Sequence, residues 1–262
     1  MNNSTQIPIG IQEQLPDPMT VCVSGVSSGI GAAQAAAFLK AGHRLFGIDR
    51  QKTPEVIQLS QDYPQQFYFK QADLSSIEEV NEAITTFKQH FTCLHVLCNT
   101  AGRLDQFLPL DQTSPDLFDQ IIKTNLYSIF YLTKGLLPLL LDQKSSRLIN
   151  MGSIAGLGAG GGGIAYTASK HAIIGFTKQM AYDYAKHGLR ANAIAPGAIA
   201  TPMNTADFEG DHPMAHWVCE QTPNQRWASP DEVAQLTLFL ASDGADYIQG
   251  SVLPIDGGWM NR

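Results

Sequence analysis

Short apolar runs alternate with longer segments of mixed polarity along most of this chain. The runs predict buried strands at residues 20–24, 44–49, 67–70, 95–98, 147–151, 190–194 and 252–255. The segments between them predict helices, the clearest at 75–90, where Val80, Ile84 and Phe87 fall on one side. Further helices are expected from a glycine loop to about residue 41 and at about 114–140, 164–187 and 229–241. This alternation predicts a single Rossmann-like α/β domain, a doubly wound parallel sheet of about seven strands with helices on both faces.

Size and charge narrow the class of protein. A chain of 262 residues with 44% hydrophobic and 16% charged residues can bury a full core. The net charge of −7 argues against a nucleic-acid partner, because phosphate binding needs a basic surface. The apolar runs are too short to cross a membrane, and residues 1–18 lack the basic start and apolar stretch of a signal peptide. We therefore expect a cytoplasmic protein with a polar N-terminal extension at 1–18 and one folded domain at 19–262.

The four cysteines have neither the spacing of metal ligands nor that of a disulfide framework. Two of them, Cys22 and Cys98, fall in predicted strands, where a thiol packs as a small hydrophobe. No metal site is expected.

The strongest candidate for chemistry is the set Ser153, Tyr166 and Lys170. Tyr166 and Lys170 are four residues apart on a predicted helix and share a face. A phenol has a pKa near ~10, and a nearby ammonium lowers that pKa by ~1–3 units, which makes proton transfer possible near neutral pH. Residues 154–165 are too glycine-rich for a regular element, so a loop there can bring Ser153 back to Tyr166.

The same spacing occurs a second time, with Tyr182 and Lys186 following Ser169. Here all three residues lie on one continuous predicted helix, which holds Ser169 roughly 20 Å from Tyr182. The second set therefore cannot converge, and Tyr182 and Lys186 are interpreted as helix surface or a subunit contact.

A glycine-rich turn links the first predicted strand to the first helix. Glycines allow a tight turn and let backbone N–H groups and the helix N-terminus approach a pyrophosphate. The residues expected to approach a dinucleotide there are Gly25, Ser27, Ser28, Gly29, Ile30 and Gly31. After the fourth strand, Asn99, Ala101 and Gly102 are expected to line the opposite side of the crevice.

Asp49 ends the second predicted strand and bears on the choice of cofactor. A carboxylate there can accept hydrogen bonds from a ribose diol, and it repels a 2′-phosphate by on the order of 6 kcal/mol at ~5 Å. NAD is therefore favoured over NADP. Arg50 could bind a phosphate instead, although a solvated surface arginine is the favoured interpretation. Asp73, after the third strand, could bond an adenine amino group, beside Leu74.

Together these motifs resemble the short-chain dehydrogenase/reductase family over essentially all of residues 19–260. The matching residues are Gly25, Gly29, Gly31, Asp73, Asn99, Ala101, Gly102, Asn125, Ser153, Tyr166, Lys170, Pro196, Gly197, Thr201, Asp256, Gly257 and Gly258. Ser24 and Thr100 stand where the family usually has threonine and asparagine, and both keep a hydrogen-bonding side chain. The resemblance implies an NAD(P)-dependent oxidoreductase whose catalytic domain is residues 19–262.

The resemblance also implies roles for individual residues. Tyr166 would be the general acid/base at the carbinol oxygen, and Ser153 would donate a hydrogen bond to that oxygen. Lys170 would lower the pKa of Tyr166 and hold the nicotinamide ribose. Asn125, which reads from sequence alone as a solvated helical amide, would bind a water that relays protons to Lys170. Pro196, Gly197, Ile199 and Thr201 would close over the nicotinamide end.

The substrate is expected to be a small or medium secondary alcohol or ketone. Residues 202–226 predict a lid, and its apolar members together with Trp227 suggest a mostly apolar pocket. His212 and His216 are four apart but have no evident third ligand, so a metal is disfavoured. Arg103 could meet an anionic substrate, although a surface arginine is the favoured interpretation.

Other functions stay open at this point. Within the family, the general resemblance is to dihydrodiol dehydrogenases and to 3-oxoacyl-carrier-protein reductases, which commonly use NADPH, so Asp49 counts against the latter. A protein that senses the cofactor without turnover is a second class, and a sugar epimerase or dehydratase is a third that the chain length disfavours. Apolar residues on several faces of the helices at 115–140 and 164–187 predict a homotetramer, or else a dimer.

Overall fold

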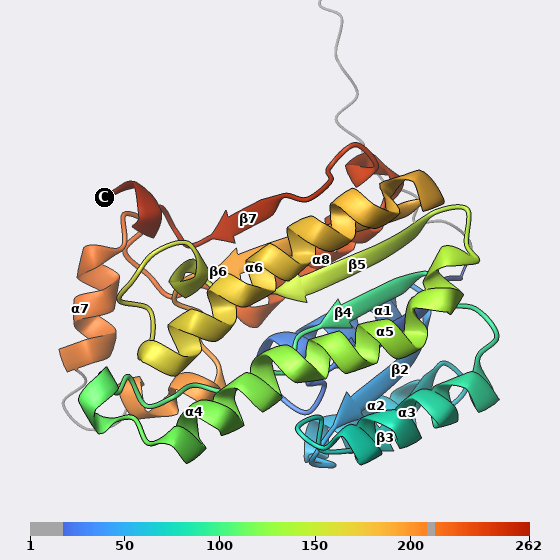
Figure 1. Cartoon of the computed structure of the whole chain (residues 1–262), viewed down its shortest axis with the longest axis horizontal. Coiled ribbons are helices and arrows are strands. Elements are labelled where there is room, and N and C mark those ends of the chain that lie inside the picture. Colours follow the sequence, from blue (N-terminus) through green and yellow to red (C-terminus); the bar gives the residue numbers. More distant parts are fainter. Residues whose placement is uncertain (1–17, 209–212) are drawn as a thin grey trace, which may run out of the picture.

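Seven parallel strands form one sheet in the order β3-β2-β1-β4-β5-β6-β7 in the computed structural model, which describes residues 18–208 and 213–262 (Figure 1). The strands are β1 (Thr20–Ser24), β2 (Arg44–Asp49), β3 (Phe67–Gln71), β4 (Val96–Asn99), β5 (Ser146–Met151), β6 (Leu189–Pro196) and β7 (Val252–Ile255). The doubly wound parallel sheet predicted from the sequence is confirmed. The order of connection reverses between β1 and β4. The segments that follow these two strands therefore leave the sheet on either side of a shared crevice.

Helices cover both faces of the sheet. They are α1 (Gly29–Lys40), α2 (Pro54–Asp62), α3 (Ile77–His90), α4 (Pro115–Ile122), α5 (Ser128–Leu141), α6 (Ile164–Tyr184), α7 (Pro213–Gln221) and α8 (Pro230–Ala241). Figure 1 shows α3, α5 and α6 in front of the sheet, with α1 and α8 behind it. Each face has its own apolar core because strand side chains alternate: Val21 and Val23 point to the α1–α8 side, and Cys22 points to the other.

Three local features were not expected from the sequence. Helix α2 buries only Val56, so its apolar pattern is weak, although Pro54 directly after Thr53 is a start signal. The expected single helix at 114–140 is interrupted by a π-helical turn, Lys123–Tyr127, between α4 and α5. Helix α7 lies within the expected lid. A π turn carries one extra residue per turn and leaves little trace in a hydrophobic pattern.

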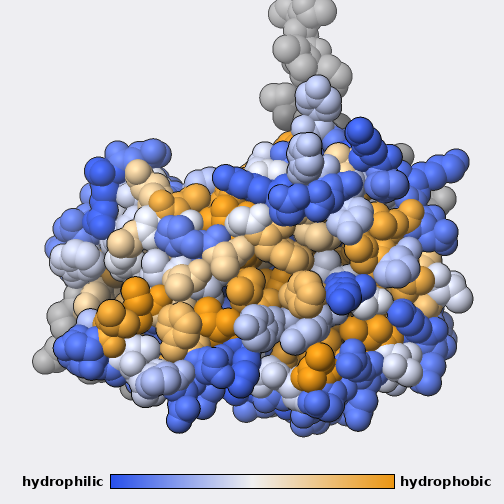
Figure 2. Space-filling model, viewed as in Figure 1, coloured by the Kyte–Doolittle hydropathy of each residue, from blue (hydrophilic) through white to orange (hydrophobic). Residues whose placement is uncertain are grey.

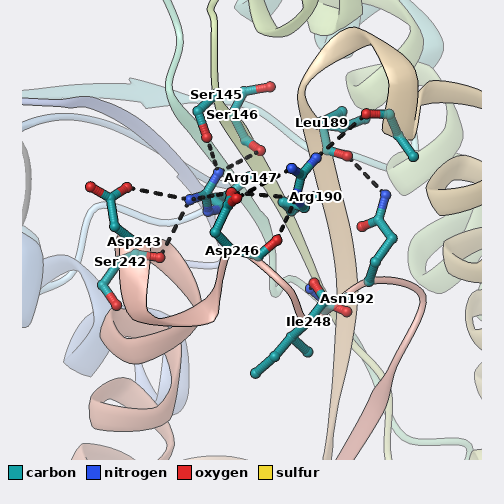
Figure 3. A network of polar contacts seen from close by, with 12 residues as sticks. Ser145, Ser146, Arg147, Leu189, Arg190, Asn192, Ser242, Asp243, Asp246 and Ile248 are labelled. Carbon is teal, nitrogen blue, oxygen red and sulfur yellow. Dashed lines mark hydrogen bonds and ion pairs between the residues drawn. The ribbon is translucent and has the colours of Figure 1, made fainter.

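At the amino ends of β5 and β6, opposite the glycine loop, two arginines and two aspartates form a network of polar contacts (Figure 3). Arg147, near the start of β5, is only 5% exposed and lies 3.5 Å from Asp246 and 3.6 Å from Asp243. Arg190, near the start of β6, donates from Nε to the Asp246 carbonyl at 2.6 Å. The segment between α8 and β7 is thereby tied to both strands, and the two carboxylates oppose the lowering of the Arg147 pKa by burial.

Two expectations concern regions that are only partly described. Of the polar extension at 1–18, residues 1–17 lie outside the described part of the chain. Residues 209–212, including His212, also lie outside it. Where the structure is described, no helix is long and apolar enough to cross a membrane.

Candidate active site

One large cavity, of about 1140 Å³, opens at the carboxyl ends of the strands. Its lining comes from the segments that follow β1 to β6, which the parallel sheet brings to one edge. Of the site residues expected from the sequence, all but Asn99 and Asn125 line this cavity. Separate loops, far apart in the sequence, thus meet at the place where open α/β sheets bind their ligands.

The glycine turn after β1 has a backbone that larger residues could not adopt. Gly25 and Gly29 have φ of +81° and +53°. A Cβ on Gly31 would lie 2.0 Å from the Gly25 carbonyl oxygen, so that position requires glycine. The side chain of Ser28, the N-cap of α1, makes no capping hydrogen bond, so the first N–H groups of the helix face the cavity without it. This cradle fits a pyrophosphate.

The two carboxylates after β2 and β3, Asp49 and Asp73, accept hydrogen bonds from their own loops. Asp49 accepts hydrogen bonds from the backbone N–H groups of Ser27, at 3.0 Å, and Gln51, at 3.2 Å. Asp73 accepts from the Ser75 N–H at 2.8 Å and from the Ser75 hydroxyl at 2.7 Å. Each carboxylate has about four acceptor positions, so both keep capacity for a ligand hydroxyl or amino group.

Arg50 is exposed and acts on Asp73 electrostatically. Partial burial tends to raise the pKa of Asp73, but the Ser75 hydrogen bonds and the charge of Arg50 together hold that pKa below its ordinary value. Arg50 therefore lines the same end of the cavity as Asp49 and Asp73.

Some residues at and after the end of β4 line the cavity, and others are buried in the interior of the protein. The Ser24 hydroxyl accepts hydrogen bonds from the N–H groups of Thr100, at 3.0 Å, and Ala101, at 3.2 Å. Thr100, Ala101 and Gly102 line the cavity. Asn99 is 1% exposed and donates to Asn150 and Thr133 inside the protein, so its side chain joins β4 to β5 and to helix α5. The expectation that Asn99 lines the crevice is therefore wrong, because its side chain is turned into the protein interior.

Ser153, Tyr166 and Lys170 come together at the wall of the cavity. Ser153 follows β5, and Tyr166 and Lys170 lie in the first turns of α6. The glycine-rich loop does fold back, so the Ser153 side chain is hydrogen-bonded to that of Tyr166. The Lys170 Nζ donates to the Met151 carbonyl at 2.8 Å and lies 5.4 Å from the centre of the Tyr166 ring. Tyr182 is 84% exposed, as its surface interpretation requires.

Burial dominates the acidity of these groups. It raises the pKa of Tyr166 to about 12, against the hydrogen bond from Ser153 and with a further contribution from Asp105. Burial also lowers the pKa of Lys170 to about 8, so the ammonium is still mostly protonated at pH 7. The expected lowering of the Tyr166 pKa is therefore wrong in this structure, because desolvation of the phenol dominates and the only opposing contribution comes from the Ser153 hydrogen bond, not from Lys170.

Asn125 points inward from the π-helical turn and is fully buried. Its Oδ1 accepts from the Arg103 N–H at 2.8 Å, and its Nδ2 donates to the Arg103 carbonyl and to the Ser169 hydroxyl. The interpretation as a solvated amide is wrong, because the π turn rotates this side chain into the protein. Asn125 holds the backbone next to Gly102, and its part in a proton relay stays a prediction.

Asp105 is a site residue that sequence reasoning missed. Its carboxylate is fully buried and accepts from the N–H groups of Gly163 and Tyr166, both at 2.8 Å. It thereby caps the N-terminus of α6 from a distant loop and fixes the backbone of Tyr166. An aspartate in a polar loop reads as solvated, so only the spatial meeting of this loop with α6 identifies it.

The expected lid residues lie around the same cavity. Pro196, Gly197, Ile199 and Thr201 line it, as do Met203, Trp217 and Trp227. Phe208 does not line it but contacts Trp227, with the ring centres 4.7 Å apart. His216 pairs with Glu220 at 3.3 Å, and among the described residues no group of three or more metal-ligating side chains is found.

We predict that Lys170→Met stabilises the protein. A buried ammonium with a pKa near 8 destabilises the folded state, because the group ionises near 10.5 when unfolded. At pH 7 the variant should gain about 1–2 kcal/mol in its free energy of unfolding, after the lost hydrogen bond to Met151 is counted. The gain should be full below pH 8 and shrink as the pH rises toward 10.5, as denaturant titrations would show.

Lys178→Met, on an exposed position of the same helix, is the matched control and should change stability little. A Lys170→Met variant less stable than the wild type at pH 7, or a difference independent of pH, contradicts the assignment.

Comparison with known proteins identifies the family. A family model described as Enoyl-(Acyl carrier protein) reductase matches residues 25–260. The chain is 33% identical over 244 residues to 3beta-hydroxysteroid dehydrogenase 2 of Eggerthella lenta, covering 92% of this chain and 94% of that one. It is 31% identical over 241 residues to the 3-oxoacyl-(acyl-carrier-protein) reductase of Thermotoga maritima, covering 91% and 96%. Gluconate 5-dehydrogenase from Burkholderia cenocepacia, solved in complex with NADP and tartrate, superposes with a TM-score of 0.87 at 27% identity, covering 95% and 98%. The chain belongs to the short-chain dehydrogenase/reductase family, whose members here are oxidoreductases acting on hydroxyl or keto groups.

Proposed function

We propose that this protein is an NAD-dependent oxidoreductase that interconverts a secondary alcohol and its ketone, with Tyr166 as the general acid/base. The observation that carries the proposal is the meeting of Ser153, Tyr166 and Lys170 at the cavity that begins with the glycine turn. The folded domain at 19–262 is then the catalytic domain, and the described parts of 202–226 act as its lid.

The residues of the cavity fit a nicotinamide dinucleotide. The glycine turn and the start of α1 would hold the pyrophosphate, Asp49 the adenosine ribose, and Pro196 to Thr201 the nicotinamide end. When bound, the nicotinamide supplies or accepts the hydride. This division leaves the protein with the proton, the orientation of the substrate oxygen and the exclusion of water.

Tyr166 and Ser153 perform the proton chemistry. In ketone reduction, Tyr166 donates its phenolic proton to the carbonyl oxygen while the Ser153 hydroxyl donates a hydrogen bond to the same atom. A phenol with a pKa near 12 is fully protonated at neutral pH, so it is ready to act as the acid. In alcohol oxidation the phenol must first lose its proton, and the Lys170 ammonium stabilises the anion so formed.

Replacing Tyr166 by phenylalanine separates an enzyme from a cofactor sensor. Tyr166→Phe keeps the ring but removes the proton donor, so ketone reduction should fall about 10²–10⁴-fold. NADH affinity, measured by fluorescence titration, should stay within about threefold of the wild type, because the glycine turn is untouched. Tyr182→Phe, in the second Tyr-x-x-x-Lys of the chain, should leave both quantities unchanged. A Tyr166→Phe variant that keeps wild-type turnover would remove Tyr166 from the mechanism.

The choice between NAD and NADP depends on Asp49. Its carboxylate lines the cavity at the end of β2 and would repel a 2′-phosphate, whereas Arg50 is exposed and acts on Asp73 as well. The gluconate 5-dehydrogenase neighbour holds NADP, which argues in the other direction for this chain. We favour NAD because the negative charge is part of this chain's own site.

Titration with NADH and NADPH tests this preference. The wild type should bind NADH at least about tenfold more tightly than NADPH, since a few kcal/mol of repulsion suffices for that ratio. Asp49→Ser should narrow the ratio, mainly by improving NADPH binding. Tighter NADPH binding by the wild type, lost in Arg50→Gln, would show that Arg50 governs the site and would favour a carrier-protein reductase, as in the Thermotoga relative.

We also propose a homotetramer. Exposed apolar side chains, Phe118, Tyr127, Phe130 and Ile164 among them, lie on α4, the π turn, α5 and α6. Figure 2 shows an apolar band across this face of the molecule. Such a band on a single chain indicates a contact with another copy.

Sedimentation at micromolar concentration should therefore report a species of four chains. Phe130→Asp should shift it toward smaller species, because a charge cannot be buried unpaired in an apolar contact. Ile57→Asp, at a similarly exposed position on α2, should not. A monomeric wild type would overturn the proposal.

A further inference from the structure

The part of the cavity that is not assigned to the cofactor has large apolar walls. Phe107, Met203, Met214 and Trp217 line the cavity and are 54%, 49%, 53% and 46% exposed. Side chains of this size are normally covered, and here they surround the space next to Tyr166 and Ser153. An apolar ligand between them would remove that surface from water, which is the main source of affinity for such a pocket.

Three tryptophans make these walls stiff. Trp217 packs edge-on against Trp259, with the ring centres 6.0 Å apart. The guanidinium carbon of Arg262 lies 3.4 Å from the centre of the Trp259 ring. Trp227 donates from Nε1 to the Ala215 carbonyl at 3.1 Å and packs against Phe208. Rings held by their neighbours cannot fold away, so they present flat faces suited to a rigid apolar body.

The cations of the same cavity each have a partner within the protein. Outside the adenosine end, the described lining has three: Lys170 donates to Met151, Arg103 to Gln120 at 3.2 Å, and Lys123 pairs with Asp119 at 2.9 Å. Asp207, by contrast, is a carboxylate that lines the cavity, and burial raises its pKa above the ordinary value. A substrate anion would meet the carboxylate of Asp207, and of these cations only Lys123 has a carboxylate partner while Arg103 is directed to Gln120.

We infer that the substrate is an uncharged, bulky secondary alcohol or its ketone, held by apolar contact with Trp217 and its neighbours, and that carboxylate-bearing substrates are rejected. The inference rests on the proposed function and deepens it. It separates this chain from gluconate-type and hydroxy-acid substrates, because recognition of a carboxylate needs a free arginine, lysine or backbone nest at the substrate end.

Matched ketones test the inference in the intact protein with whichever reduced nicotinamide binds more tightly. Ketone reduction is followed for 4-oxopentanoate and its methyl ester, for the series 2-butanone to 2-octanone, and for the fused-ring ketone 2-decalone. We expect the ester to exceed the acid in kcat/KM by at least about tenfold. We expect each added methylene to raise kcat/KM about threefold to fivefold until the walls are filled, and 2-decalone to be the best of the set.

Two variants locate the effect. Trp217→Ala should lower kcat/KM for 2-decalone by at least about tenfold but change 2-butanone much less, whereas Trp217→Phe should keep most of the activity on both. Asp207→Asn should narrow the difference in kcat/KM between 4-oxopentanoate and its methyl ester. The outcomes that overturn the inference are an acid preferred over its ester, no dependence on apolar size, or equal losses on both ketones in Trp217→Ala.

Failure of the proposed function gives a different result. If no ketone is reduced although NADH binds, the oxidoreductase proposal fails, and the pocket is then tested by quenching of tryptophan fluorescence in the cofactor-loaded protein. Saturable binding of 2-decalone that exceeds binding of 4-oxopentanoate would still support an apolar ligand. Tighter binding of 4-oxopentanoate, or no binding of 2-decalone, would overturn the inference independently of catalysis.

Discussion

The polar backbone groups at the carboxyl edge of the sheet set the constraint on which this site depends. Where a parallel strand ends, its chain leaves the hydrogen-bonded ladder inside the protein, and each buried N–H or carbonyl then needs another partner. Side chains supply these partners: Ser24 for Thr100 and Ala101, Asn125 for Arg103, and Asp105 for Gly163 and Tyr166. The same bonds that satisfy the backbone hold the cavity open and keep its walls in register, so stability and site geometry have one origin.

Lys170 shows where this arrangement works against stability. Its ammonium is buried with a single carbonyl partner, and desolvation displaces its pKa and that of Tyr166 in opposite directions. Both shifts favour the neutral form of each group, so the folded protein does not favour a tyrosinate–ammonium ion pair between them. A polar group that reaches the cavity and hydrogen-bonds to either side chain would relieve part of that desolvation. The desolvated titratable groups are thus concentrated where a substrate oxygen would lie.

The fold was predictable from the sequence because its signals are local and repeated. Strand runs such as 20–24 and 252–255 are apolar enough to identify, and their alternation with helices determines the parallel topology. Helix α2 and the π turn were not predicted from the sequence. Helix α2 buries only one residue, and the π turn adds one residue to a helical turn. At the site, the glycine positions and the Tyr166–Lys170 spacing could be identified from the sequence alone. The burial of Asn99, the cap formed by Asp105 and the pKa of Tyr166 depend on surroundings contributed by distant segments, which no local pattern encodes.

Reaction type and substrate have different structural supports in this chain. The backbone of Tyr166 and Gly163 at the start of α6 is anchored by buried hydrogen bonds to Asp105, so removing that carboxylate leaves two N–H groups without a partner and is costly. The apolar walls belong to residues 203–208 and 213–227 and to the C-terminal segment, where side chains such as Met203 and Met214 are half exposed. Substitution at such positions changes stability little. Function depends on the site more than on the fold, so the walls, more than the overall similarity to relatives that share about a third of the sequence, bear on what this protein binds.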